Sequence, residues 1–155
     1  MKEIIMHPIG FISSPFTILS EVPRQASLAE SVEAYVEVKK TYQQGLDDLD
    51  GFSHALILFY FHKSTREDIK STPYTGNVAR GIFAIRSPHR PNHIGCSVVS
   101  IKRIEKNRLY FTRVDMVDKT PVLDIKPYIP SIDNQKTVSL GWVNKYLDQR
   151  NENNK

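Results

Sequence analysis

The chain of 155 residues contains a single cysteine and only seven glycines. With Cys96 alone, no intramolecular disulfide framework can form, and such sparing use of cysteine is typical of a reducing compartment. The glycines do not form the G-x-G-x-x-G turn that opens a Rossmann fold. A nucleotide-like cofactor would therefore need a binding site of another kind.

Long hydrophobic runs are also missing. The longest, "ALILFYF" at residues 55–61, is much shorter than the roughly 20 residues that cross a bilayer. The N-terminus has no signal-peptide core before His7 and Pro8 interrupt it. We therefore expect a cytoplasmic protein with no membrane partner.

What remains is the composition of an ordinary globular protein with a basic balance. A content of 40% hydrophobic residues is enough to form one core. We expect one domain over residues 4–147 and a polar, disordered tail over residues 148–155. The net charge of +4 is a mild indication of a polyanionic partner such as nucleic acid.

Hydrophobic periodicity favours strands over helices. Alternation predicts a half-buried strand at residues 31–38, and continuous apolar runs predict central strands at 54–62 and 81–86. Two more strands are expected at 96–104 and 107–115, joined by a turn. Helical patterns are limited to a short segment at 41–51, ending at Gly51, and a C-terminal helix at 139–150. The pattern predicts a mainly β fold, a compact antiparallel β-barrel with a few short helices.

Three polar clusters that contain proline interrupt these strands. The second, "RSPHRPNHIG" at residues 86–95, is either a stiff solvated loop or an anion site in which Arg86 and Arg90 serve different partners. Zinc binding by His89 and His93 would need a helix, which Pro91 disfavours, so we expect no metal site. The other two clusters are "PRQAS" at residues 23–27 and "DKTPVLDIKPY" at residues 118–128.

Acid–base chemistry is one interpretation of the third cluster. Asp118, Asp124, Lys126 and Tyr128 could line a pocket, or the segment could be a turn followed by a strand, with Asp118 capping the turn. His54 fits a structural role at the end of a buried strand. His62 is open between structure and function, because it continues into the polar stretch "HKST".

Taken together, five motifs resemble those of the TrmO, or TsaA-like, family of S-adenosylmethionine-dependent tRNA methyltransferases. They are "IGFISSPF", "PRQ", "LDGFSHALILFYFHK", "RSPHRPNHIG" and "TPVLDIKPYIP". The resemblance implies a compact β-barrel, usually a homodimer. It also implies tRNA as substrate and N6-methylation of threonylcarbamoyladenosine beside the anticodon.

The resemblance also implies S-adenosylmethionine as cofactor and a set of contacts to it. These contacts fall on Pro23, Arg24, Gln25, His62, Lys63, Arg86, Cys96, Asp118, Lys119, Thr120 and Pro121. Three positions depart from the usual family pattern: His93 replaces a proline, Cys96 a leucine, and Lys119 a glycine. Lys119 would place a new charge near the sulfonium.

Methyl transfer to an acylated nitrogen is helped by a base, because that nitrogen is a poor nucleophile until it loses its proton. We expect Asp124 as this base, with Tyr128 as second choice. Arg90 and Lys126 are expected to hold tRNA phosphates or the threonylcarbamoyl carboxylate. Two alternatives remain: a non-catalytic RNA-binding barrel, and a methyltransferase of the same fold acting on a different small substrate.

Overall fold

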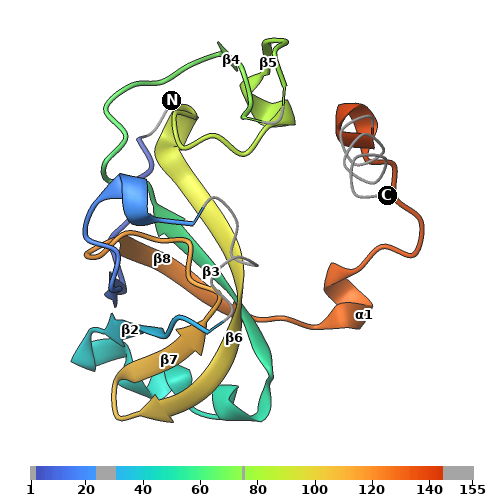
Figure 1. The fold of residues 1–155 in the computed structure, drawn as a ribbon. Helices are drawn as coiled ribbons and strands as arrows, with labels where there is room; N and C mark the ends of the chain where they lie inside the picture. The colour runs from blue at the N-terminus through green and yellow to red at the C-terminus, as the bar shows by residue number, and fades with distance from the viewer. Residues whose placement is uncertain (1–2, 24–30, 75, 145–155) are drawn as a thin grey trace.

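A computed structural model describes residues 3–23, 31–74 and 76–144. Its centre is a closed antiparallel barrel of six strands in the order β1-β2-β7-β6-β3-β8 (Figure 1). The strands are β1 Gly10–Ser13, β2 Ala34–Val38, β3 His54–Tyr60, β6 Ile94–Glu105, β7 Arg108–Thr112 and β8 Pro121–Pro127. The predicted mainly β fold is confirmed.

Outside the barrel lie a small hairpin and several short helices. The hairpin pairs β4 Lys70–Ser71 with β5 Arg80–Gly81, and the α-helix is α1 Pro130–Asp133. The 3₁₀ helices are η1 Leu19–Glu21, η3 Lys40–Leu46, η4 Leu49–Gly51, η5 Ile82–Ala84, η6 Pro91–His93 and η7 Gly141–Val143. Among the described residues, no helix has the length and apolar character that crossing a membrane requires.

Strand alternation directs one face of each barrel strand into the core. On β2 the buried side chains are Ala34, Val36 and Val38, as the sequence predicts. Between β3 and β6, Gly95 faces Phe59, and a Cβ at Gly95 would overlap the Phe59 ring. Glycine is thus required here by the close approach of an aromatic ring.

Four predicted elements differ from the structure. The apolar run 81–86 is a 3₁₀ turn and not a central strand, because only Ile82 and Ile85 reach the core. The strand expected at 107–115 ends at Thr112, since Arg113 adopts a left-handed backbone. The helix expected at 41–51 is split into η3 and η4, the second ending at Gly51 as predicted. Of the C-terminal helix, residues 139–144 contain only η7, and the remainder lies outside the described residues.

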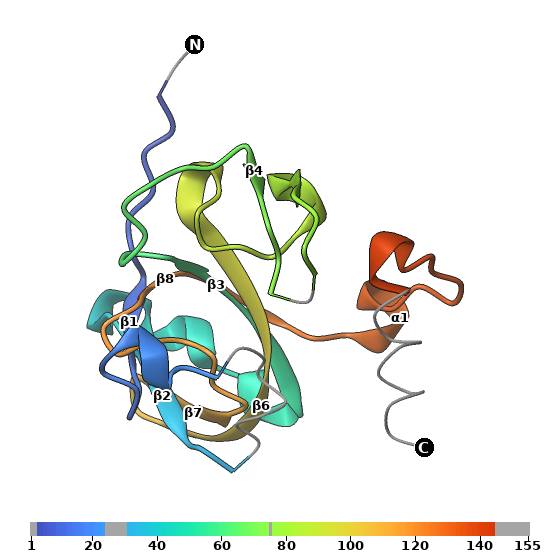
Figure 2. The ribbon, with the colours of Figure 1, turned by 45° about the horizontal axis from the view of Figure 1, so that its top comes forward.

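After β8 the chain leaves the barrel as an arm, residues 128–144, which begins with α1. Figures 1 and 2 show this arm rising beside the barrel towards the β4–β5 hairpin. There Trp142 Nε1 donates a hydrogen bond to the Ala84 carbonyl at 2.9 Å, and the Arg80 guanidinium lies 5.2 Å from the Trp142 ring centroid. The arm is therefore tied to the hairpin at its far end.

Candidate functional site

The predicted polar motifs gather at one end of the barrel because of how the strands run. Leu58 of β3 lies between Cys96 of β6 and Asp124 of β8 in the hydrogen-bonded register. Since both neighbours are antiparallel to β3, the end of β3 meets the beginnings of β6 and β8. Residues 62–63, 86–95 and 118–121 adjoin these strand ends. The strand β1, also antiparallel to β8, ends there too and leads to Pro23.

The loop 86–95 is fixed by its histidines. His89 Nδ1 shares a hydrogen bond of 2.8 Å with Ser64 Oγ, and His93 Nδ1 bonds the Pro88 carbonyl at 3.1 Å. The Phe61 amide donates to the His93 carbonyl at 2.8 Å. These contacts join the loop to the segment that carries His62 and Lys63.

His93 also explains how this loop departs from the family pattern. Its φ is +48°, and that of Asn92 is +63°. Proline holds φ near −65°, so a proline could not occupy position 93 without a different local backbone. The left-handed backbone at position 93 is therefore compatible with histidine and excludes proline.

Arg86 and Cys96 lie close to a carboxylate that sequence reasoning missed. Ser97 Oγ donates a hydrogen bond of 2.7 Å to Asp115 Oδ1. Burial raises the pKa of the Asp115 carboxyl, while this hydrogen bond and the positive charge of Arg86 lower it. Partial burial of the thiol raises the pKa of Cys96, and Arg86 opposes that shift. The cluster thus combines a guanidinium, a hydroxyl, a thiol and a carboxylate.

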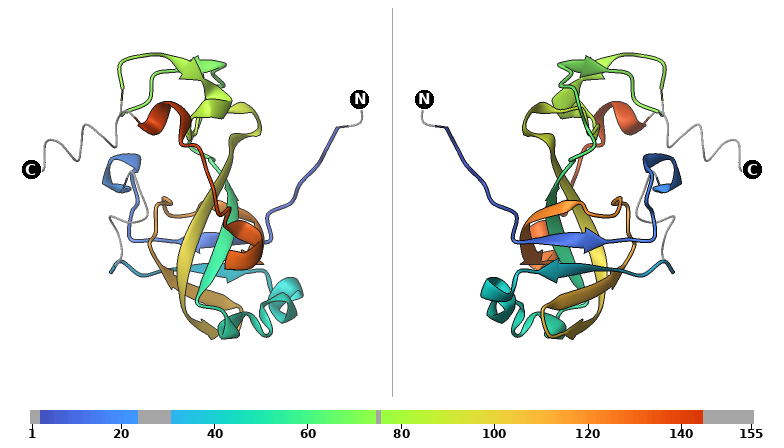
Figure 3. Two further views of the ribbon diagram at one scale, coloured as in Figure 1. Left: turned by 90° about the vertical axis from the view of Figure 1, so that its right-hand side faces the viewer. Right: turned by 90° about the vertical axis from the view of Figure 1, so that its left-hand side faces the viewer.

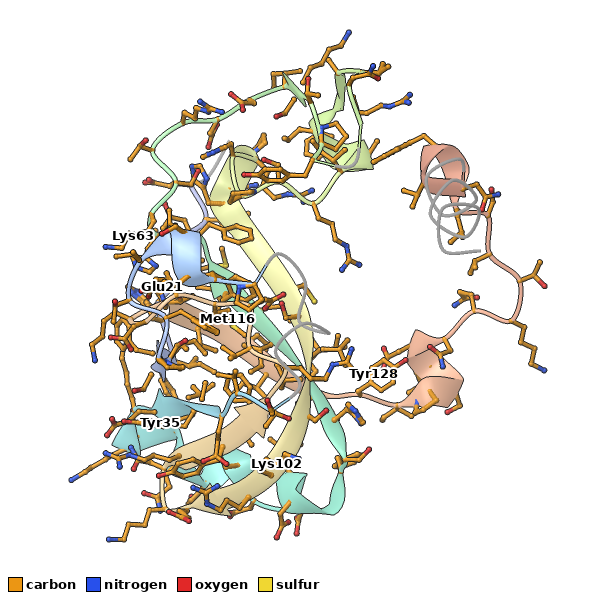
Figure 4. The ribbon with its side chains drawn as sticks, in the orientation of Figure 1. Glu21, Tyr35, Lys63, Lys102, Met116 and Tyr128 are labelled. Atoms are coloured by element: carbon orange, nitrogen blue, oxygen red, sulfur yellow. The ribbon has the colours of Figure 1, made fainter. Side chains whose placement is uncertain are left out.

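Asp115 comes from a segment that packs between the strands. Its neighbours Val114 and Met116 are buried in the core, and Figure 4 shows Met116 within the barrel. Alternation then turns Asp115 away from the core residues beside it. That pattern, a carboxylate between two core residues in "RVDMVD", was the signal in the sequence that could have identified it.

The first two predicted cofactor motifs are only partly described. Pro23 is half-buried at the end of a described stretch, whereas Arg24 and Gln25 lie outside the described residues. His62 is half-buried and Lys63 is exposed. Desolvation by burial and the neighbouring charge of Lys63 lower the pKa of His62, so its imidazole is neutral at pH 7.

The turn at residues 118–121 is bound tightly to β1. Asp118 Oδ1 accepts a hydrogen bond from the Ser14 amide at 3.1 Å, and the Lys119 amide donates to the Ile12 carbonyl at 2.9 Å. Buried Thr120 donates its hydroxyl to the Val117 carbonyl at 2.7 Å. The side chains of Asp118 and Thr120, together with the backbone amides of residues 118–120, thus fix the turn against β1 and the segments beside it.

Asp124 and Lys126, predicted for different tasks, are paired with each other. Lys126 Nζ lies 2.7 Å from Asp124 Oδ2, and Asp124 Oδ1 accepts a hydrogen bond from the Ile125 amide. The hydroxyl of Tyr128 donates to Asn134 Oδ1 at 2.6 Å. Figure 4 shows Tyr128 near α1 and Lys63 on the other side of the barrel, so one chain does not bring these two residues together.

Arg90 is half-buried and donates from Nη1 to the Ile85 carbonyl at 3.3 Å. This bond uses one nitrogen of the guanidinium. In the part of the chain that the structure describes, no group of three or more His, Cys, Asp or Glu residues could hold a metal ion.

Comparison with known proteins identifies the family of this chain. Residues 11–134 match the family of the tRNA-methyltransferase O N-terminal domain. The chain belongs to this family. The resemblance inferred from the motifs is thereby confirmed, and the match covers the last four motifs in full and the first from Phe11 onward.

Relatives of the family differ in length from this chain. A probable S-adenosyl-L-methionine-binding protein of Pyrococcus abyssi is 42% identical, over 92% of this chain and 77% of its own length. The tRNA (adenine(37)-N6)-methyltransferase of Mus musculus is 37% identical, over 89% of this chain but only 34% of its own. The crystal structure of TrmO from Pseudomonas aeruginosa aligns with a TM-score of 0.77 and 35% identity, covering 91% of this chain and 63% of that one.

Proposed function

We propose that this protein is an S-adenosylmethionine-dependent tRNA methyltransferase that methylates N6 of threonylcarbamoyladenosine beside the anticodon. The observation that carries the proposal is that residues 62–63, 86–96 and 118–121, on which the family's cofactor contacts are expected, meet at one end of the barrel. The relatives support the cofactor and the reaction class, since they are named for binding S-adenosylmethionine or for methylating tRNA adenine.

The donor set at this end fits the cofactor. S-adenosylmethionine carries a carboxylate, an ammonium and a sulfonium. Arg86 supplies a guanidinium for the carboxylate, and Asp115 supplies a half-buried carboxylate for a cationic group. Pro23, Arg24, Gln25, His62, Lys63, Cys96 and residues 118–121 are proposed to complete the binding site. The cofactor supplies the electrophilic methyl group, and the protein supplies its position.

The acceptor side of the reaction involves the pair of Asp124 and Lys126. We propose that an anionic group of the substrate, a phosphate or the threonylcarbamoyl carboxylate, draws Lys126 away from Asp124. Asp124 then accepts the proton from the acylated nitrogen. Tyr128 is the second candidate for this role, and Arg90 is proposed to hold a further anionic group with its remaining donors.

A homodimer is part of the proposal. It is supported by apolar side chains that the described arm leaves exposed, Ile132, Val138 and Leu140. It would also explain how Tyr128 could reach a cofactor site, namely that of the other protomer. Sedimentation of the full chain is the direct measurement of its oligomeric state.

Two arginine variants test the proposed function. Arg86→Ala should weaken S-adenosylmethionine binding in calorimetry by about tenfold, as expected when one charge-assisted pair is lost. Arg90→Ala should leave that affinity unchanged and lower the rate of tRNA methylation. Equal effects of both variants on cofactor affinity would contradict this division of roles.

The wild-type protein separates the alternatives. A non-catalytic RNA-binding barrel would bind tRNA but show no saturable binding of S-adenosylmethionine. A methyltransferase for a small substrate would bind the cofactor yet leave tRNA unmodified. Nucleoside mass spectrometry of tRNA incubated with enzyme and cofactor should show the methylated modified adenosine if the proposal holds.

A further inference from the structure

A second concave surface lies on the outside of the barrel, beside the site already described. Between β1, β2 and the 118–121 turn there is a hollow of about 400 Å³. Figure 3, in its right-hand view, shows β1 and β2 side by side on this face. The residues that could contact a ligand there include Phe11, Tyr35, Lys39, Lys40, Asn107 and Lys119.

The aromatic side chains of the hollow point outward because of strand alternation. In the β1–β2 register, Phe11 pairs with Glu37 and Ser13 with Tyr35, and these lie on the face opposite to the buried Ile12 and Val36. The Phe11 side chain is 43% exposed. A large apolar ring is therefore available to a ligand on a surface that is otherwise charged.

Lysine dominates the charge around the hollow. Glu37 is its one acidic lining residue, and it is paired with Arg108 at 3.5 Å. Lys39 and Lys40 form no ion pair with any residue that the structure describes. Lys119 is 76% exposed and lies 3.7 Å from Asp118. Lys39 and Lys40 are thus two positive charges at the hollow without a carboxylate partner among the described residues, beside an exposed third lysine, Lys119.

Lys119 has a backbone conformation that suits glycine better than lysine. Its φ is +64°, in the left-handed region that costs an L-residue roughly 1–2 kcal/mol. Lysine is present here despite that cost, and its side chain lines the hollow.

We propose that this hollow binds a nucleotide of the tRNA, with its phosphate held by Lys39, Lys40 and Lys119 and its base or ribose against Phe11. The inference rests on the proposed function, because it extends the tRNA contact from the cofactor turn along the outer face of β1. Lysines that neutralise phosphate together with an exposed aromatic ring are the usual components of single-stranded RNA binding. The positive charge of Lys119 then contacts an RNA phosphate, whereas the sequence alone predicts only that it lies near the sulfonium of the cofactor.

A double variant tests the hollow. Lys39→Ala with Lys40→Ala should weaken binding of full-length tRNA by about tenfold near physiological salt and reduce the slope of log affinity against log salt by about 2. Its calorimetric affinity for S-adenosylmethionine should match that of the wild type. Lys70→Ala, which removes one exposed lysine on the β4–β5 hairpin, is the single-charge control and should lose less than Lys39→Ala or Lys40→Ala alone.

A single variant tests the strained lysine. Lys119→Gly relieves the left-handed backbone, so its Tm should rise while its affinity for tRNA falls several-fold. A general loss of structure would lower both quantities, so opposite shifts identify the side chain as an RNA contact. Unchanged tRNA affinity in Lys119→Gly would contradict the inference.

The outcomes separate this inference from the proposed function. If the wild type binds no tRNA, the proposed function fails and the inference fails with it. If the wild type binds and methylates tRNA but the double variant binds equally well, only the assignment of the hollow is overturned. Phe11→Ala should weaken binding without changing the salt slope, since the ring carries no charge.

Discussion

Two outer faces of the barrel arrange their polar side chains in different ways. On the face of β2, β7 and the end of β6, Arg103 is hydrogen-bonded to Glu33 at 2.8 Å and to Glu105 at 2.7 Å. Its guanidinium also lies 3.8 Å from the ring centroid of Tyr110. The hydrogen bonds that Arg103 donates to Glu33 and Glu105 raise its pKa. The charge of Arg103 is thus already matched within the chain.

The face of β8, β3 and the beginning of β6 is different. In its register Cys96 and Asp124 lie on either side of Leu58, which is half-buried. At the same end of the barrel, burial raises the pKa of the Asp115 carboxyl. The comparison shows that Arg103 is matched by carboxylates of its own face, whereas the Asp115 carboxyl at the motif end is held at an energetic cost that a ligand can offset.

The largest expected effect concerns the packing between β3 and β6. Gly95→Ala should lower the free energy of unfolding by about 1–3 kcal/mol, because the added methyl group overlaps the Phe59 ring. Chemical denaturation measures this change. Gly81→Ala is the control, since a Cβ there meets nothing within 4 Å, and equal losses in both variants would show that the Phe59 contact is not the cause.

The second largest effect is expected on cofactor affinity and concerns Asp115. Asp115→Asn should weaken S-adenosylmethionine binding by about tenfold, as for a lost charge-assisted contact. It should leave the affinity for S-adenosylhomocysteine, whose sulfur is neutral, nearly unchanged. Calorimetry with both ligands checks this prediction. An equal loss for both would mean that Asp115 shapes the site without acting on the sulfonium.

The same variant changes the pH dependence of stability. The native pKa of Asp115 lies above its unfolded value, so its contribution is present at low pH and is lost as pH rises through the native pKa. At pH 7 the buried carboxylate is therefore destabilising. Asp115→Asn should raise Tm at pH 7 and bring less benefit at pH 3, and a lower Tm at pH 7 would contradict this account.

The smallest effect is expected on the charge-paired face. Arg103→Gln should leave both Tm and cofactor affinity within measurement error, because exposed ion pairs contribute little to stability. Thermal unfolding and calorimetry under the conditions used for Asp115→Asn allow direct comparison. A loss of tRNA affinity in Arg103→Gln would extend the RNA surface beyond the hollow.

Much of the fold could be predicted from the sequence because alternation reports directly which face of a strand is buried. Residues 31–38 contain β2, and residues 54–62 contain β3. The run 81–86 does not form the predicted strand, because a short apolar stretch does not distinguish a strand from a packed turn. Whether the barrel closes depends on the pairing of β1 with β8, which no local pattern indicates.

The candidate site was predictable in its motifs but not in its contacts. The family resemblance implies roles for Arg86 and the 118–121 turn, but it gives no indication of Asp115, whose proposed role depends on its hydrogen bond to Ser97 and on burial. The pairing of Asp124 with Lys126 could have been anticipated, since residues two apart on a strand share a face. The hollow beside Lys119 could not, because it joins residues distant in the chain.

The strand pairs that close the barrel differ in length, and the shortest pair is expected to open first. β1 and β8 share only two paired positions, whereas β3 and β6 share seven. The pairing of β1 with β8 is therefore the one that breaks most readily during local unfolding. Hydrogen bonds join the 118–121 turn, which leads into β8, to Ile12 of β1 and to Ser14 after it. A ligand that binds this turn therefore stabilises the closed barrel, and removal of the ligand favours opening between β1 and β8.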